Sequence, residues 1–88
     1  LIGMARSMAR ELGSRNITAN VVAPGPVATE MLASLTEAQQ TAITDQVPLG
    51  RVAQPEEIAQ MINFLASENG AYITGAVIPV DGGLGMGH

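Results

Sequence analysis

An apolar run that stops at two prolines constrains this chain more than any other feature. Residues 17–23 are β-rich and almost continuously apolar, which is typical of a strand covered on both faces in a parallel sheet. The run ends at Pro24-Gly25-Pro26, where each proline fixes its own φ angle and favours extended conformations in the residue before it. Because open α/β sheets bind ligands where their strands end, we expect a ligand site at this corner.

Helical patterns lie on both sides of this run. Residues 1–12 place apolar side chains three and four positions apart, so we predict a helix that Gly13 ends in the left-handed conformation. Pro55 opens a second helix, about residues 55–68, with acids in its first turn and one apolar stripe. A short apolar run follows at residues 76–80. Strand, crossover helix and strand together predict a right-handed, parallel βαβ unit.

The segment between the corner and the second helix is predicted to be weakly anchored. Ser34 and Thr36 each have Glu or Gln three residues later, which predicts a short helix starting near residue 36 or 37 and ending before Pro48. Its apolar positions are few and small. We therefore expect a mobile segment rather than part of the core.

Composition and charge narrow the classes of function. The 88 residues are 47% apolar and carry a net charge of −4, with no Lys among the four basic residues. We expect no nucleic-acid partner, because binding phosphates requires a basic surface. We also expect no membrane partner, because no apolar stretch approaches the roughly 20 residues that span a bilayer. The lack of Cys excludes a thiolate metal site and fits a cytoplasmic protein.

Other candidate groups are better explained by structural roles. Residues 82–87 are Gly-rich but do not open a helix, as a phosphate-binding loop would. Tyr72 has no lysine to lower its pKa, so we assign it to packing or an interface. Glu56 and Glu57 point about 100° apart on a helix and are assigned to the helix dipole. We expect His88, alone at the end, to be inert, and we expect no metal site.

The corner itself supports two interpretations. The backbone N–H and C=O of one residue could together bind a carboxamide, which offers a matching acceptor and donor, with the Thr29 hydroxyl close by. Alternatively, the segment is an ordinary strand-to-helix turn in which Thr29 is the N-cap. Asn20, inside the preceding strand, is expected to be at least half-buried and to bond neighbouring backbone groups.

Six short motifs occur in the order and spacing of a known family. They are Pro24-Gly25-x-Val27-x-Thr29-x-Met31, Pro48-Leu49-Gly50-Arg51, Pro55-x-Glu57-Ile58-Ala59, Phe64-Leu65-Ala66-Ser67, Tyr72-Ile73-Thr74-Gly75 and Val80-Asp81-Gly82-Gly83. This set resembles the C-terminal third of short-chain dehydrogenases/reductases. Within that family the chain is most similar to the 3-oxoacyl-[acyl-carrier-protein] reductases, a likeness that the ending Gly85-Met86-Gly87-His88 strengthens.

The resemblance implies an α/β fold and a cofactor. The chain would be the C-terminal portion of one doubly wound parallel-sheet (Rossmann-like) domain, with two parallel strands and flanking helices, that holds NADP(H). Val27 would bind the nicotinamide carboxamide through its backbone, and Thr29 would hydrogen-bond the carboxamide or the pyrophosphate. Pro24 and Gly25 would shape the corner.

The resemblance also implies a lid and partners. Met31 and Leu32 would lie in a substrate lid spanning about residues 30–47, and Arg15 would face an acidic acyl carrier protein. The two long helices and the last strand would form the interfaces of a homotetramer. The Ser, Tyr and Lys that catalyse in this family lie upstream, so no catalytic residue is expected here. With Leu1 already inside a helical pattern, we expect a fragment that does not catalyse by itself.

The leading prediction is a fragment of an NADPH-dependent enzyme that reduces 3-oxoacyl-[acyl-carrier-protein] to the 3-hydroxyacyl form in fatty-acid biosynthesis. One alternative is a non-catalytic assembly module that associates through its two long helices and last strand. Another is a short-chain dehydrogenase that acts on a different alcohol, sugar or acyl thioester.

Overall fold

The structure is a computed structural model and describes residues 1–86. The prediction made for His88, and the last two residues of the Gly-Met-Gly-His ending, lie outside the described residues. In chain order the elements are α1 (Ile2–Leu12), η1 (Gly13–Arg15), β1 (Val21–Pro24), α2 (Glu30–Ala33), α3 (Glu37–Asp45), α4 (Pro55–Ala66), η2 (Glu68–Gly70) and β2 (Val77–Val80).

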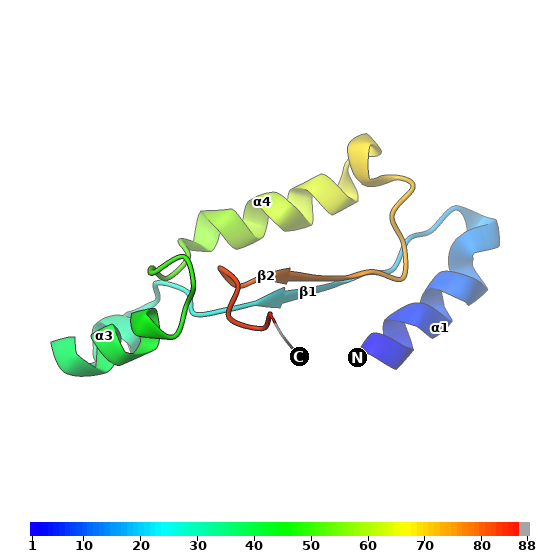
Figure 1. Cartoon of the computed structure of the whole chain (residues 1–88). Coiled ribbons are helices and arrows are strands. Elements are labelled where there is room, and N and C mark those ends of the chain that lie inside the picture. The colour runs from blue at the N-terminus through cyan, green and yellow to red at the C-terminus, as the bar shows by residue number, and fades with distance from the viewer. Residues whose placement is uncertain (87–88) are drawn as a thin grey trace.

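The two strands form a parallel pair with α4 between them in the chain. The register runs from Val21 opposite Val77 to Pro24 opposite Val80. Helix α4 lies along the strands and contacts β1 (Figure 1). The predicted parallel βαβ unit is therefore confirmed. The α/β fold, with two parallel strands and flanking helices, is the one expected from the sequence.

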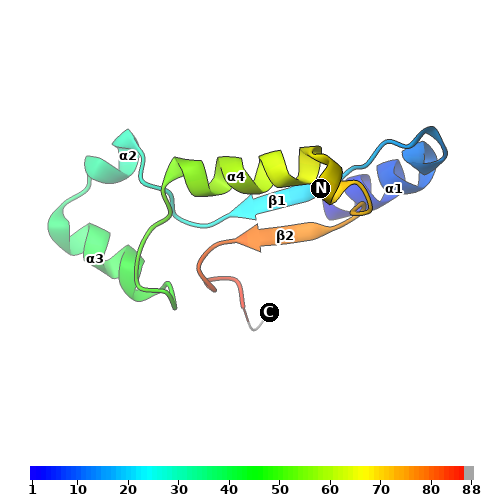
Figure 2. The same ribbon diagram turned by 90° about the horizontal axis from the view of Figure 1, so that it is seen from above.

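The strand direction determines what lies at each end of the sheet. Both strand arrows point toward α2 and α3, whereas α1 lies beyond the opposite ends (Figure 2). The Pro-Gly-Pro corner and the segment expected to be a lid thus share the carboxyl end of the sheet. This is the edge at which open α/β sheets bind ligands.

The end of α1 differs from the expectation. Gly13 has φ −58°, so the prediction that it takes the left-handed conformation is wrong. The chain continues through the 3-10 turn η1, and Asn16 takes the left-handed conformation instead, with φ 61°. Its N–H donates to the Gly13 carbonyl at 2.9 Å. Apart from glycine, asparagine is the residue type that best tolerates the left-handed conformation. The chain therefore turns at Asn16, three residues beyond Gly13.

The strand predicted over residues 17–23 is shorter than expected, because its first half is held by single bonds rather than a ladder. The Gly75 N–H donates to the Ala19 carbonyl at 2.7 Å. The Ala19 N–H donates to Thr74 Oγ1 at 3.0 Å. The motif Tyr72-Ile73-Thr74-Gly75 therefore fastens the entry to β1.

Asn20 completes this fastening and behaves as expected. Its side chain is half-buried. Nδ2 donates to the Ile73 carbonyl at 3.0 Å, and Oδ1 accepts from the Ala76 N–H at 3.0 Å. One amide thus satisfies two backbone groups and ties β1 to the segment that leads into β2.

The molecule is elongated and has a small core. Among the apolar residues described, the buried ones are Ala5, Val47 and Leu65. The accessible surface is 6423 Å², against about 4,900 Å² for a compact monomer of this mass. The radius of gyration is 15.6 Å, against about 12 Å for a compact domain of this length. Over residues 1–86, no helix combines the length and apolar character needed to cross a membrane.

Candidate functional site

The corner after β1 is pressed against the turn that follows β2. The Gly25 N–H donates to the Val80 carbonyl at 3.1 Å. A Cβ built on Gly25 would lie 2.8 Å from both Cα and Cβ of Asp81. Real Cβ atoms do not approach other carbons so closely, so only glycine fits here without moving the backbone.

Asp81 organises the Gly-rich turn behind the corner. Its Oδ1 accepts from the Gly83 N–H at 2.9 Å, and its Oδ2 accepts from the Gly85 N–H at 3.0 Å. These glycine amides therefore bond an internal carboxylate rather than facing an open anion site. This arrangement agrees with the structural role expected for residues 82–87, as far as residue 86.

The backbone N–H and C=O of Val27 point away from Ala53, its partner in a parallel bridge. The segment pairs with Ala53 as a parallel bridge: the Ala28 N–H donates to the Ala53 carbonyl at 2.8 Å, and the Ala53 N–H donates to the Pro26 carbonyl at 2.9 Å. In such a bridge the N–H and C=O of the central residue point to the other side. Within residues 1–86 neither group of Val27 has a hydrogen-bond partner, so both can bind a ligand.

Thr29 begins α2 and is its N-cap. Its Oγ1 accepts from the Leu32 N–H at 3.3 Å. The interpretation of Thr29 as an N-cap is therefore confirmed. This role as N-cap does not exclude a ligand contact by Thr29, because a hydroxyl that accepts one hydrogen bond still has its own proton to donate.

The segment expected to be a lid contains two short helices, α2 and α3, neither with a buried residue. Met31 is 80% exposed and Leu32 is half-buried. Helix α3 starts as predicted. Thr36, rather than Ser34, forms the capping box: the Gln39 N–H donates to Thr36 Oγ1 at 3.2 Å, and the Thr36 N–H donates to Gln39 Oε1 at 3.0 Å.

The C-terminal end of the lid segment is anchored to the turn after β2. Val47 is buried, and its Cγ1 would lie 2.6 Å from a Cβ placed on Gly82. The Leu49 N–H donates to the Gly82 carbonyl at 3.1 Å. Gly82 also has φ +63°, so both space and conformation require glycine. The expectation that the apolar positions of this segment lie outside the core is therefore wrong for Val47, which packs against the turn after β2. The two helices of the segment have no buried residue.

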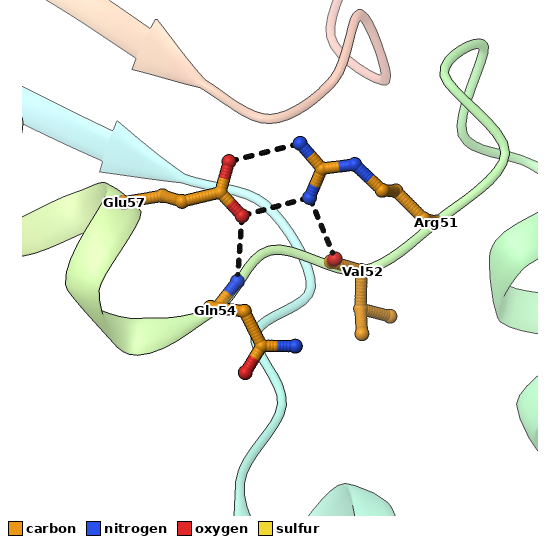
Figure 3. A network of polar contacts seen from close by, with 4 residues as sticks. All are labelled: Arg51, Val52, Gln54 and Glu57. Carbon is orange, nitrogen blue, oxygen red and sulfur yellow. Dashed lines mark hydrogen bonds and ion pairs between the residues drawn. The ribbon is translucent and has the colours of Figure 1, made fainter.

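An ion pair that was not predicted from the sequence links the loop before α4 to the first turn of α4 (Figure 3). Arg51 donates to Glu57 through two parallel bonds, Nη1 to Oε1 at 2.7 Å and Nη2 to Oε2 at 2.9 Å. The same Nη1 donates to the Val52 carbonyl at 3.3 Å, and Glu57 Oε1 also accepts from the Gln54 N–H at 2.9 Å.

The assignment of Glu57 to the helix dipole alone is incomplete, because its carboxylate is also bonded to Arg51. The hydrogen bonds from Arg51 and from the Gln54 backbone lower the pKa of Glu57 to about 2, from an ordinary 4.5. The sequence contains both partners but no spacing rule that connects them. Arg51 shortly precedes Pro55, which opens a helix whose third residue is acidic.

A shallow groove of about 450 Å³ runs between these features. Its lining includes Pro26 from the corner, Arg51 and Glu57 from the ion pair, and Asp81 from the turn after β2. The groove therefore joins the corner, the ion pair and the last strand on one side of the molecule.

Two other expected interaction residues lie away from the corner. Arg15 is exposed in η1, beyond the amino ends of the strands. Tyr72 is fully exposed, at 103%, so of its two expected roles an interface fits better than packing. In the part of the chain that the structure describes, no group of His, Cys, Asp or Glu is placed to hold a metal ion.

Comparisons with known proteins show what the chain is similar to. A family model described as enoyl-(acyl carrier protein) reductase matches residues 1–85. The 3-oxoacyl-[acyl-carrier-protein] reductase MabA of Mycobacterium tuberculosis is 57% identical over 88 residues, which is 100% of this chain and 36% of that protein. FabG, the reductase of the same name from Escherichia coli, is 50% identical over 86 residues, covering 98% of this chain and 35% of FabG.

A solved structure with the same fold is that of a blue fluorescent protein from a metagenomic library, in complex with NADPH. It superposes with a TM-score of 0.87 at 43% identity, covering 96% of this chain and 34% of that one. The chain thus spans about a third of the length of the curated relatives it matches. The family match and these identities show that the chain belongs to the short-chain dehydrogenase/reductase family and is similar to its 3-oxoacyl-[acyl-carrier-protein] reductases.

Proposed function

We propose that residues 1–88 form the nicotinamide side of an NADP(H) site in a longer reductase. That enzyme would reduce 3-oxoacyl-[acyl-carrier-protein] to the 3-hydroxyacyl form in cytoplasmic fatty-acid biosynthesis. The single observation that carries the proposal is that the N–H and C=O of Val27, at the carboxyl end of the sheet, have no hydrogen-bond partner within residues 1–86. The names of the relatives, and the NADPH bound to the similar solved structure, support the choice of substrate and cofactor.

The corner suits a carboxamide for a chemical reason. A carboxamide has one acceptor oxygen and an NH₂ donor, so the N–H and C=O of one residue can bind both at once. The Ala53 bridge holds Val27 from one side, and the neighbouring prolines limit the backbone conformations. A ligand that binds here does not have to order the backbone first, which lowers the cost of binding.

The hydroxyl of Thr29 supplies the next contact. Its proton is free to donate to the carboxamide oxygen or to a pyrophosphate oxygen, while its oxygen continues to cap α2. When bound, the reduced nicotinamide ring of NADPH would supply the hydride. The residues of this chain hold and orient that ring, and the proton donor would come from outside residues 1–88.

The remaining surfaces have roles in the same proposal. The exposed segment with α2 and α3 would close over the substrate, with Met31 and Leu32 against the acyl chain. Arg15 would contact an acidic carrier protein from η1. Helices α1 and α4 and strand β2 would pair with other subunits in a homotetramer, which agrees with the exposed apolar side chains Met4, Met8, Ile62 and Phe64 on the two helices.

Variants of Thr29 in the full-length protein test the proposal. We expect the wild type to consume NADPH when given a 3-oxoacyl thioester. Thr29→Ser keeps the cap and the donor and should change little. Thr29→Asp keeps the cap, because Asp caps as well as Ser, but it removes the donor and adds a negative charge beside the cofactor. Losing a hydrogen bond costs about 1 kcal/mol for a neutral carboxamide and about 1.5–3 kcal/mol for a charged pyrophosphate, so we expect the KM for NADPH to rise by roughly 5- to 100-fold.

The melting temperature separates folding from binding in this series. Thr29→Ser and Thr29→Asp should both unfold near the wild-type temperature. No thioester-dependent oxidation of NADPH by the wild type would contradict the proposed reaction. Equal cofactor affinity in Thr29→Asp and wild type would instead contradict the role of Thr29. A panel of alcohol, sugar and acyl thioester substrates then distinguishes the carrier-protein reductase from other family activities.

A further inference from the structure

The ion pair of Arg51 and Glu57 holds the short backbone segment 52–54 at both of its ends. At one end, Arg51 Nη1 donates to the Val52 carbonyl at 3.3 Å. At the other, Glu57 Oε1 accepts from the Gln54 N–H at 2.9 Å. The two bonds between the side chains join these ends (Figure 3). Residues 52–54 are therefore fixed by side chains on both sides of them.

Ala53, in the middle of residues 52–54, is hydrogen-bonded to the residues on either side of Val27. Both backbone groups of Ala53 are used on the corner, its N–H donating to the Pro26 carbonyl and its C=O accepting from the Ala28 N–H. The plane of the peptides on either side of Val27 therefore depends on where Ala53 lies. A shift of residues 52–54 would rotate the N–H and C=O of Val27.

We propose that Arg51 and Glu57 are positioning residues for the cofactor, acting through Ala53 to aim the backbone of Val27 at the nicotinamide carboxamide. This inference rests on the proposed function, since it assumes that Val27 binds the carboxamide. Neither side chain needs to touch the cofactor. Glu57 is ionised at neutral pH, as its ordinary pKa of 4.5 already ensures, and the bonds from Arg51 and Gln54 lower that pKa to about 2.

The exposure of the pair favours positioning over stability. The side chains of Arg51 and Glu57 are 56% and 38% exposed, and exposed ion pairs contribute little to folding. What distinguishes this pair is its geometry. It has two parallel bonds plus one bond to the backbone from each partner, an arrangement that Lys in place of Arg cannot reproduce.

The test compares two ligands in the full-length protein. NADPH contains the nicotinamide, whereas 2′-phospho-ADP-ribose is the same molecule without that ring. The variants are Arg51→Lys and Glu57→Gln, and the matched control is Glu56→Gln, which removes a carboxylate from the same helix turn. The dissociation constants for both ligands are measured by calorimetry, and the melting temperature is recorded for each protein.

We expect the two variants to bind NADPH roughly 3- to 10-fold more weakly, the effect of about one hydrogen bond. They should bind 2′-phospho-ADP-ribose like the wild type, and Glu56→Gln should match the wild type for both ligands. A merely structural role would weaken both ligands together. Equal weakening of both, or no weakening of NADPH, would overturn the inference.

The charge-swapped double variant Arg51→Glu/Glu57→Arg sharpens the test. It restores the attraction between the two side chains, but Glu at position 51 cannot donate to the Val52 carbonyl and Arg at position 57 cannot accept from the Gln54 N–H. We therefore expect no recovery of NADPH binding, and full recovery would overturn the positioning role. If the wild type binds 2′-phospho-ADP-ribose but gains nothing from the nicotinamide, the proposed role of Val27 fails, and the positioning role fails with it.

Discussion

Gly25 shows how one missing Cβ brings two segments of the chain together. Its backbone bonds Val80, and its Cα faces Asp81 so closely that any side chain would meet backbone atoms 2.8 Å away. The corner and the turn after β2 are consequently held against each other. The place of Val27 thus depends on the last strand as well as on its own.

Replacing Gly25 by Ala should therefore cost more than most exposed glycine substitutions. Overpacking of this kind destabilises by about 1–3 kcal/mol, so we expect the full-length protein to unfold at a lower temperature and to bind NADPH more weakly. The measurement is thermal unfolding with and without NADPH.

Gly13→Ala is the matched control for this prediction. A Cβ at Gly13 would meet nothing within 4 Å, and the residue is already right-handed. We expect a neutral effect or a gain of about 0.5–1 kcal/mol. If Gly13→Ala destabilised the protein as much as Gly25→Ala, the close contact with Asp81 would not be the cause.

At the scale of elements, the ion pair at the start of α4 makes a small contribution to stability that depends on the charge of Glu57. The folded pKa of Glu57, about 2, lies below its ordinary value of 4.5. A lowered pKa stabilises the fold above the unfolded value, and this contribution is lost as the pH falls through the folded value. The contribution of Glu57 should accordingly be complete above about pH 5 and should disappear between about pH 4.5 and pH 2.

This dependence can be measured as a difference between two proteins. The melting temperatures of wild type and Glu57→Gln should differ at pH 7 and converge as the pH approaches 2. Because both side chains are largely exposed, we expect a small difference that shrinks further in high salt. A gap between the two proteins that stayed constant from pH 7 to pH 2 would show that the lost charge does not matter.

The long elements could be predicted from the sequence because their signals are local and repeated. The apolar spacing of residues 1–12 and 55–68 located α1 and α4 to within two residues at each end. The capping spacing near residue 36 located the start of α3. The details at the ends could not be predicted in the same way. Gly13 and Asn16 both tolerate the left-handed conformation, and only the 3-10 turn between them determines which one takes it.

The site was partly predictable from the sequence. The corner at Pro24 to Thr29 was marked by its prolines, and the role of Val27 came from resemblance to a family. The bridge between Val27 and Ala53 has no local signal, because it joins single residues of two irregular segments. The pair of Arg51 and Glu57 reaches across a loop into a helix, so it follows none of the spacings that connect side chains within one element.

At the scale of the whole molecule, the main feature is the large surface that stays accessible to solvent. The accessible area exceeds that of a compact monomer by about 1,500 Å², and three apolar side chains are buried in the described part. Contacts outside residues 1–88 would be needed to cover α1 and the outer side of α4. This is the feature that the assembly-module alternative and the reductase proposal share.

The 88-residue chain by itself should bind NADPH too weakly to detect by calorimetry. The corner offers the backbone of Val27 and one hydroxyl, and hydrogen bonds of this kind contribute about 1 kcal/mol each. Together they fall short of the roughly 4 kcal/mol that corresponds to a millimolar dissociation constant. Micromolar binding by the isolated chain would contradict this expectation and would mean that the corner is a complete site.

The strand pair also has a consequence for how quickly the chain reaches its fold. Asn20 bonds Ala76 across 56 positions, so the sheet cannot form until a long stretch of chain has closed on itself. For a loop of this length the entropic cost is about 4 kcal/mol, whereas α1 and α4 need only neighbouring residues. Such non-local pairing slows folding, so we expect the helices to form early. The corner at residues 24–29, which bonds the end of β2 through Gly25, would then be among the last parts to form during synthesis.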